Sequence, residues 1–168
     1  MTQPANHYQR QMLLAAPPAA VYQALTTTPG LRAWWTPTCE ADSEVGGRAV
    51  FRFDSTQKAM RITRLQPDRE VAWQCVEAHI DARGVQHKDE WVGTHIMFRL
   101  SPAQGGSHTQ LDFEHIGLTP ALECFDVCSS GWNQFLDSLQ AWVETGQGRP
   151  FIPSNTPSDV PSASPVAA

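Results

Sequence analysis

A histidine lies in phase with the apolar side of a predicted strand and is the first candidate for chemistry. Leu111, Phe113 and His115 fall on one face of that strand, while polar residues alternate with them on the other. A predicted helix begins soon after His115, and its positive end favours a neutral imidazole. Such a ring could contact a ligand or act as a general acid or base. The alternative is a structural histidine that bonds the backbone near the start of the helix.

Glu77 is a weaker candidate of the same kind. It shares the alternation phase of Trp73 and Cys75, so an inward carboxylate beside an aromatic wall could act as a general base. The alternative is a solvated side chain at a strand end.

Metal and redox chemistry have less support. His79 and His87 flank a predicted turn, with Asp89 and Glu90 nearby, but the spacing matches no metal-binding signature. We therefore expect no metal and no other cofactor.

The cysteines do not form a redox pattern. Cys124 and Cys128 are one helical turn apart, unlike a C-x-x-C pair. They are expected to pack in the core, as are Cys39 and Cys75. Four sparse cysteines within apolar patterns favour buried thiols in a reducing cytoplasm.

Composition excludes several classes of protein. The 168 residues carry a formal net charge of −5, which argues against nucleic-acid binding through a basic surface. With 41% hydrophobic and 17% charged residues, the chain is too apolar to be disordered. It has no apolar run of membrane-spanning length, and the apolar stretch near residue 12 is too short for a signal peptide. We therefore expect a cytoplasmic protein that does not insert into membranes.

The elements that would position these residues follow from periodicity and from the breakers between them. Residues 8–14 predict a strand, and Pro17 and Pro18 open a short helix that runs to residue 25. A second helical turn spans residues 31–35. Residues 38–117 alternate with period two and predict an antiparallel meander. In its strand 90–100, the phase places Trp91 outside unless a bulge near Gly93 reverses the faces.

A long amphipathic helix closes the predicted domain. Thr119 and Pro120 are typical of a helix start, and an apolar stripe with spacings of three and four continues to about residue 145. Gly131 would let this helix approach the sheet closely. Residues 1–152 are expected to form one domain, and residues 153–168 a disordered tail rich in Pro, Ser and Ala.

The proportions of these elements imply a cavity. Six or seven strands make a sheet roughly 25–30 Å wide, whereas one helix is only about 10–12 Å across. The sheet must therefore curl around the helix, and the space between them would suit a small ligand. The expected lining consists of inward aromatic side chains and their neighbours: Trp34, Trp35, Phe51, Phe53, Trp73, Phe98, Phe113, His115, Phe125, Cys128 and Trp132.

Five segments, in the correct order and spacing, resemble one family. They are Ala16-Pro17-Pro18-Ala19-Ala20-Val21-Tyr22, Leu31-Arg32-Ala33-Trp34-Trp35-Thr36-Pro37, Gly46-Gly47 before Phe51, residues 111–117 (LDFEHIG), and Gly131-Trp132 before Phe135 and Leu136. This order is similar to that of the START-like (SRPBCC) superfamily and its branch of heat shock protein 90 ATPase activator homologues. The resemblance implies an α+β helix-grip fold, in which a curved antiparallel sheet surrounds one long C-terminal helix and two short helices lie near the N-terminus.

The resemblance also sets out the functional alternatives. The favoured hypothesis is a protein that binds a small hydrophobic or amphipathic ligand without catalysis. The others are an enzyme of the polyketide cyclase or dehydratase kind, using His115 or Glu77, and an interaction module related to the chaperone activators. A protein partner or a homodimer is compatible with all three.

Overall fold

The computed structural model describes residues 6–154, whose strands form one seven-stranded antiparallel sheet in the order β1-β7-β6-β5-β4-β3-β2. The strands are β1 (Tyr8–Leu14), β2 (Cys39–Ala41), β3 (Arg48–Phe53), β4 (Thr56–Gln66), β5 (Glu70–His79), β6 (His95–Ala103) and β7 (His108–Ile116). The helices are α1 (Pro18–Thr26), α2 (Thr28–Trp34) and α3 (Phe125–Thr145), with a short 3-10 turn at Gln104–Gly106. The predicted fold class is confirmed.

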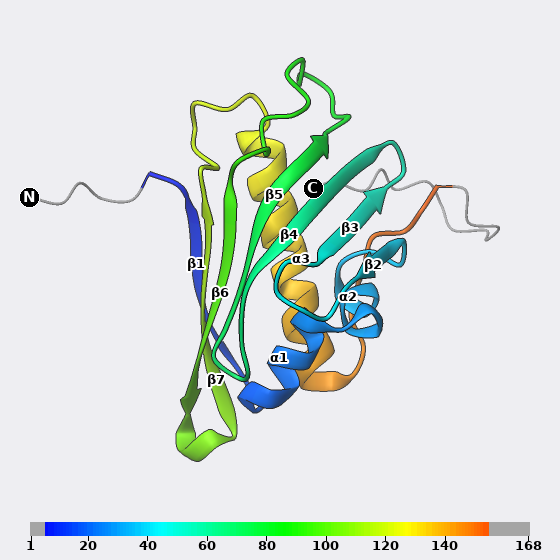
Figure 1. The fold of residues 1–168 in the computed structure, drawn as a ribbon. Coiled ribbons are helices and arrows are strands. Elements are labelled where there is room, and N and C mark those ends of the chain that lie inside the picture. Colours follow the sequence, from blue (N-terminus) through cyan, green and yellow to red (C-terminus); the bar gives the residue numbers. More distant parts are fainter. Residues whose placement is uncertain (1–5, 155–168) are drawn as a thin grey trace, which may run out of the picture.

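The long helix lies across one face of the curved sheet, and α1 and α2 sit at one end of it (Figure 1). The two layers meet through apolar faces. Phe98 and Phe113 from the sheet and Trp132 and Phe135 from α3 are fully or almost fully buried. The first strand of the chain lies beside the last one, because β1 pairs along its whole length with β7, from Tyr8 opposite His115 to Leu14 opposite Thr109.

The two short helices form a compact plug. The Thr27 hydroxyl accepts a hydrogen bond from the Gly30 N–H and caps α2. A Cβ on Gly30 would lie 2.8 Å from the Cα of Ala24, so only glycine lets the two helices pack this closely. Trp34 then donates its indole N–H to the Ala24 carbonyl at 2.8 Å. We call this region, built from α1, α2 and the side chains under them, the plug end.

The long helix begins later than predicted. Residues 119–124 form turns, and α3 starts at Phe125 rather than at Thr119. The reason is a capping group from elsewhere in the chain: the Glu90 carboxylate accepts hydrogen bonds from the backbone N–H groups of Glu123 and Cys124, both at 3.1 Å. Glu123 accordingly lies before the helix and not in its first turn.

Trp91 lies inside the protein, which corresponds to the predicted alternative of a reversal near Gly93 and not to the simple alternation of the strand. Strand β6 begins at His95, and Gly93 adopts φ +91 in a turn closed by the hydrogen bond from the Thr94 N–H to the Trp91 carbonyl at 2.9 Å. A side chain is strained at such a backbone angle, whereas glycine is not. The turn directs Trp91 into the core, where it is fully buried.

Glu77 points outward, which corrects its predicted inward position. The pairing of β4 with β5 shifts between Ala59 and Met60, which face Glu77 and Cys75 respectively, so that Val76 is an extra residue. A bulge of this kind exchanges the two faces of a strand. The Glu77 side chain is 61% exposed and forms an ion pair with Arg48.

Most of the expected tail lies outside the described residues. Within residues 6–154, no helix is both long and apolar enough to cross a membrane. Residues beyond α3 return to the plug end, where the Phe151 N–H donates to the Trp35 carbonyl at 2.7 Å and the Phe151 side chain is buried.

Candidate functional site

A buried lysine marks the opposite end of the core. Lys58 lies on β4 in phase with Thr56, Met60 and Ile62, all of which are buried. Its side chain is 0% exposed, and its ammonium nitrogen has no hydrogen-bond partner among residues 6–154. The other buried polar side-chain atom without a partner in this range is the Ser129 hydroxyl on α3. A buried cation without a partner is costly, so this arrangement needs an explanation.

Aromatic faces surround the Lys58 ammonium. Its Nζ lies 3.9 Å from the centre of the Trp91 ring and 4.8 Å from that of Phe53. Such cation–π contacts recover only part of the lost hydration. Burial therefore lowers the pKa of Lys58 to about 8, against the raising effect of the Cys128, Cys75 and Cys124 thiols, while the charge of Lys58 acts in turn on His115.

His115 is buried beside this lysine, but both of its ring nitrogens are occupied. The Trp132 indole N–H donates to Nδ1 at 3.0 Å. Thr94 uses its hydroxyl hydrogen toward the Trp91 carbonyl, so its oxygen accepts from the His115 Nε2–H at 2.8 Å. These partners fix the neutral Nε2–H tautomer. Burial, assisted by the Lys58 charge, lowers the pKa of His115 to about 3.

Three cysteine thiols complete the set of polar groups around Lys58. Cys128 accepts a hydrogen bond from the Trp91 indole N–H at 3.2 Å, and its pKa is lowered by the hydrogen bond from Cys124 and by the Lys58 charge. The pKa of Cys124 is raised correspondingly. On β5, burial raises the pKa of Cys75 to about 12. The four cysteines of the chain, these three and Cys39, are buried free thiols.

Two loops cover this group of side chains. The β5–β6 loop (residues 80–94) supplies Trp91, and the β7–α3 loop (residues 117–124) leads into α3. Glu123 accepts from the backbone N–H groups of Gln86 and His87, at 3.0 and 2.7 Å, and Glu90 bonds the start of α3 in return. We call this region the loop end. It consists of Lys58, Trp91, His115, Cys124 and Cys128 under the two loops.

The expected open cavity is filled, because the predicted lining residues pack against one another. Trp35 lies 4.2 Å from Phe51 and 5.1 Å from Trp132, and Phe113 lies 4.6 Å from Trp132, measured between ring centres. The width argument did not count the volume of five buried tryptophans.

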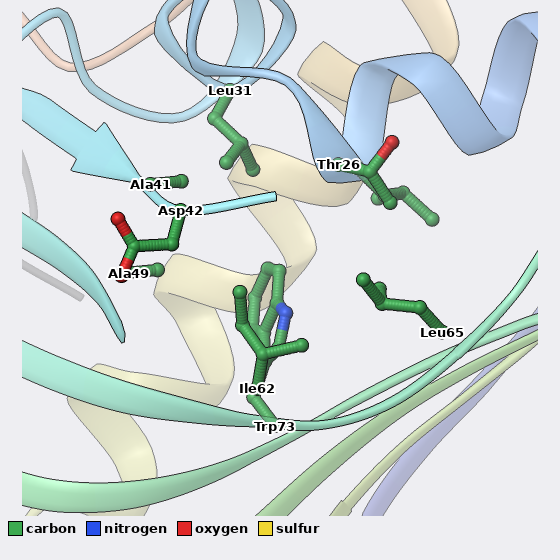
Figure 2. A pocket seen from close by; sticks show the side chains of 9 residues that line it. Thr26, Leu31, Ala41, Asp42, Ala49, Ile62, Leu65 and Trp73 are labelled. Atoms are coloured by element: carbon green, nitrogen blue, oxygen red, sulfur yellow. The ribbon is translucent and has the colours of Figure 1, made fainter. Parts of the chain in front are cut away.

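A small cavity lies near the plug end (Figure 2). It measures about 10 Å³, roughly the space of one water. Leu31, Ile62, Leu65 and Trp73 line it, and no residue of the loop end does.

The predicted site residues divide between the two ends of the core. Ten of the eleven lining candidates are buried: Trp34, Trp35, Phe51, Phe53, Trp73, Phe98, Phe113, His115, Cys128 and Trp132. Phe125 is half-buried at the edge of the core. His79 is not brought together with His87, which instead bonds Glu123, and within residues 6–154 no group of three side chains could hold a metal. Sequence reasoning missed Lys58, although its inward phase was visible.

The antiparallel sheet that grips one long helix, with two short helices at one end, defines a START-like helix-grip protein. A family model described as activator of Hsp90 ATPase homolog 1-like protein matches residues 15–144, so the chain belongs to that family. Among curated proteins, none matches this sequence significantly.

Solved structures agree with this fold. The solution structure of the Aha1 dimer from Colwellia psychrerythraea is 29% identical, with a TM-score of 0.69 over 84% of this chain and 98% of that one. CalU16 from Micromonospora echinospora is 21% identical, with a TM-score of 0.60 over 80% and 72% of the two chains. The protein EF2215 from Enterococcus faecalis, of unknown function, is 20% identical, with a TM-score of 0.61 over 86% and 75%. The last two similarities concern the fold alone.

Proposed function

We propose that this protein binds a small amphipathic molecule between the sheet and α3, with the polar group of the molecule at Lys58. The observation that carries the proposal is the fully buried Lys58 ammonium without a hydrogen-bond partner among residues 6–154. A hydrogen-bond acceptor or an electrophile on a ligand would satisfy this group, and binding would then offset the cost of burying it.

The apolar part of the ligand would lie against the aromatic side chains of the loop end. Trp91 and Trp132 stack with ring centres 6.0 Å apart, and Phe53 is the second ring facing Lys58. These faces suit an alkyl or aryl group. Because the interior is filled, Trp91 must move aside when a ligand binds.

The loops at this end support such a movement. Residues 80–94 contain no helix or long strand, and Glu90 and Glu123 hold them through hydrogen bonds at the molecular surface. Segments attached in this way open at a lower free energy than the packed core. The proposal also places the chain in a reducing compartment such as the cytoplasm, where Cys124 and Cys128 beside Lys58 stay thiols.

Ligand titration tests the proposal. Octanal, octanol and octanoate would be titrated into the full chain, with tryptophan fluorescence and thermal shift as readouts. We expect saturable binding of at least one compound, weakened by Lys58→Met and unchanged by Lys88→Met at the surface. Absence of saturable binding and of any thermal shift across a wider lipophilic panel would refute the proposal.

An interaction role is the second candidate, and the similarity to the Aha1 dimer favours it. Its test is the ATPase rate of the Hsp90-type chaperone from the same organism, measured with and without the protein, together with its mass in solution. A stimulated ATPase rate would favour this role over ligand binding. The cyclase-like alternative required His115 or Glu77 as a free acid or base, and we do not propose it.

A further inference from the structure

We infer that the polar group recognised at the loop end is a carbonyl, and that Lys58 binds it covalently and reversibly as an imine. This inference rests on the proposed interior binding and specifies its chemistry. An aldehyde or a ketone with an apolar tail is the ligand class that the surroundings of Lys58 favour.

The first support is the absence of a counter-ion. Lys58 forms no ion pair with any carboxylate of residues 6–154, and the groups that face it are the rings of Phe53 and Trp91, the thiols of Cys75, Cys124 and Cys128, and His115. Of these groups, only the Cys128 thiol has a pKa lowered to about 7 and can take up a negative charge, so no permanently charged group in this set holds the lysine in its ammonium form. An amine in such surroundings is partly neutral at physiological pH, and a neutral amine is a nucleophile.

The second support is a comparison of the charges left in the core when Lys58 pairs with a carboxylate and when it forms an imine. A carboxylate ligand would need the ammonium form and would place an ion pair in an apolar core, where desolvation cancels much of the attraction. An imine is uncharged and needs no counter-ion. Imine formation therefore removes the unpaired cation altogether, whereas an anion only pairs with it.

The reaction balances without an oxidant or a reductant. The lone pair of the neutral Lys58 amine forms a bond to the carbonyl carbon, and the π electrons of the carbonyl move to its oxygen. A proton passes from nitrogen to that oxygen and gives a carbinolamine, which loses water to give the imine. Hydrolysis reverses the sequence. The Cys128 thiol, which interacts electrostatically with Lys58, is the group that would relay the proton.

The sequence itself supplies the control, because the chain has only two lysines. Lys88 lies at the surface, donates to the Val85 carbonyl at 3.1 Å and pairs with Asp81 at 3.4 Å. One peptide map can therefore distinguish an adduct at the buried Lys58 from an adduct at the surface Lys88.

The test is reductive trapping. The full chain is incubated with octanal and cyanoborohydride, and the adduct is located by intact mass and peptide mapping. We expect one adduct at Lys58 in the wild type and in Lys88→Arg, with the yield reduced roughly tenfold or more in Lys58→Arg and Lys58→Met. The yield at Lys58 should rise between pH 7 and 9, since its pKa is about 8.

The outcomes separate this inference from the proposal beneath it. Saturable binding of octanal or octanol without an adduct at Lys58 would overturn the imine and leave interior binding intact. An adduct confined to Lys88 or to the α-amino group would also overturn it. If neither binding nor an adduct occurs with octanal or with a bulkier aryl aldehyde, both statements fail.

Discussion

Both ends of the core contain a stacked pair of tryptophans, but they differ in polarity. At the plug end, Trp34 and Trp35 stack with ring centres 5.5 Å apart, and the Trp34 N–H bonds a backbone carbonyl. At the loop end, Trp91 stacks near Trp132 but also covers the Lys58 ammonium. The plug end is apolar, and its buried Trp34 N–H bonds the backbone, whereas the loop end contains an ionisable group that has no hydrogen-bond partner among residues 6–154.

This difference assigns stability mainly to the plug end and ligand binding mainly to the loop end. Packing at the plug end is supported by two helices and by Phe151, so it resists opening. At the loop end, the fold carries the cost of burying Lys58, and its cover consists of loops. Destabilised groups of this kind are frequent where proteins bind ligands. The comparison can be tested by five substitutions.

The largest effect is expected from truncating a tryptophan at the plug end. Trp35→Ala should lower the free energy of unfolding by about 3–5 kcal/mol, because Trp35 is fully buried against Phe51, Trp73 and Trp132. Trp91→Ala is the matched change at the loop end and should cost less, since it also lets water reach Lys58. Urea denaturation measures both. Equal losses would remove the distinction between the two ends.

Replacing the buried lysine should stabilise the protein. The pKa of Lys58 falls from 10.5 to about 8 on folding, so its charge costs about 3 kcal/mol below pH 8. Lys58→Met should recover most of this, less about 1 kcal/mol for the lost cation–π contact.

The pH dependence of the stability of the same variant tests whether folding lowers the pKa of Lys58. Between about pH 8 and 10.5 the unfolded state binds the extra proton, so Lys58 makes stability rise with pH in this window. The difference between wild type and Lys58→Met should therefore shrink as the pH increases. A constant difference would show that folding does not lower the pKa of Lys58.

Acid should destabilise the protein through His115. Its pKa is about 3 in the fold against 6.5 for an exposed ring, so the unfolded state takes up the proton first as the pH falls below 6.5. The loss should reach about 2 kcal/mol at pH 5. His115→Gln should be less stable at pH 7 but should lose less on acidification, whereas the exposed His95→Gln should follow the wild type. Parallel curves for all three proteins would contradict the buried neutral ring.

The smallest effect is expected at the surface of the loop end. Glu90→Gln should cost about 1 kcal/mol, since it weakens the charged cap on the N–H groups that precede α3. Amide hydrogen exchange in residues 80–94 should become faster, while exchange in α1 stays unchanged. Asp89→Asn, at the neighbouring position, is the control. Unchanged exchange in the loop would show that Glu90 does not hold it closed.

Much of the fold could be predicted because it depends on local patterns. Alternation along residues 110–116 and the apolar stripe of α3 are properties of short windows, and both are present in the structure. The predictions failed where distant segments decide. The start of α3 depends on Glu90, which is more than thirty residues away, and the direction of Glu77 depends on a bulge in its pairing with β4.

The candidate site was less predictable than the fold. His115 was placed in the core correctly, but its two partners, Thr94 and Trp132, come from other elements. Lys58 was overlooked, although it alternates with Met60 and Ile62 on one face. A lysine in such a phase usually reaches solvent with its flexible end, whereas here the rings of Trp91 and Phe53 lie over its ammonium.

The pairing of β1 with β7 also affects how the chain folds as it leaves the ribosome. During synthesis, residues 8–14 have no partner strand until residues 109–115 have left the ribosome. Contacts of such long sequence separation slow folding and expose apolar strands during synthesis. The sheet is therefore completed only after almost the whole domain has been translated, and a nascent chain that still lacks β7 would present β1 and the edge of β6 for association with other chains.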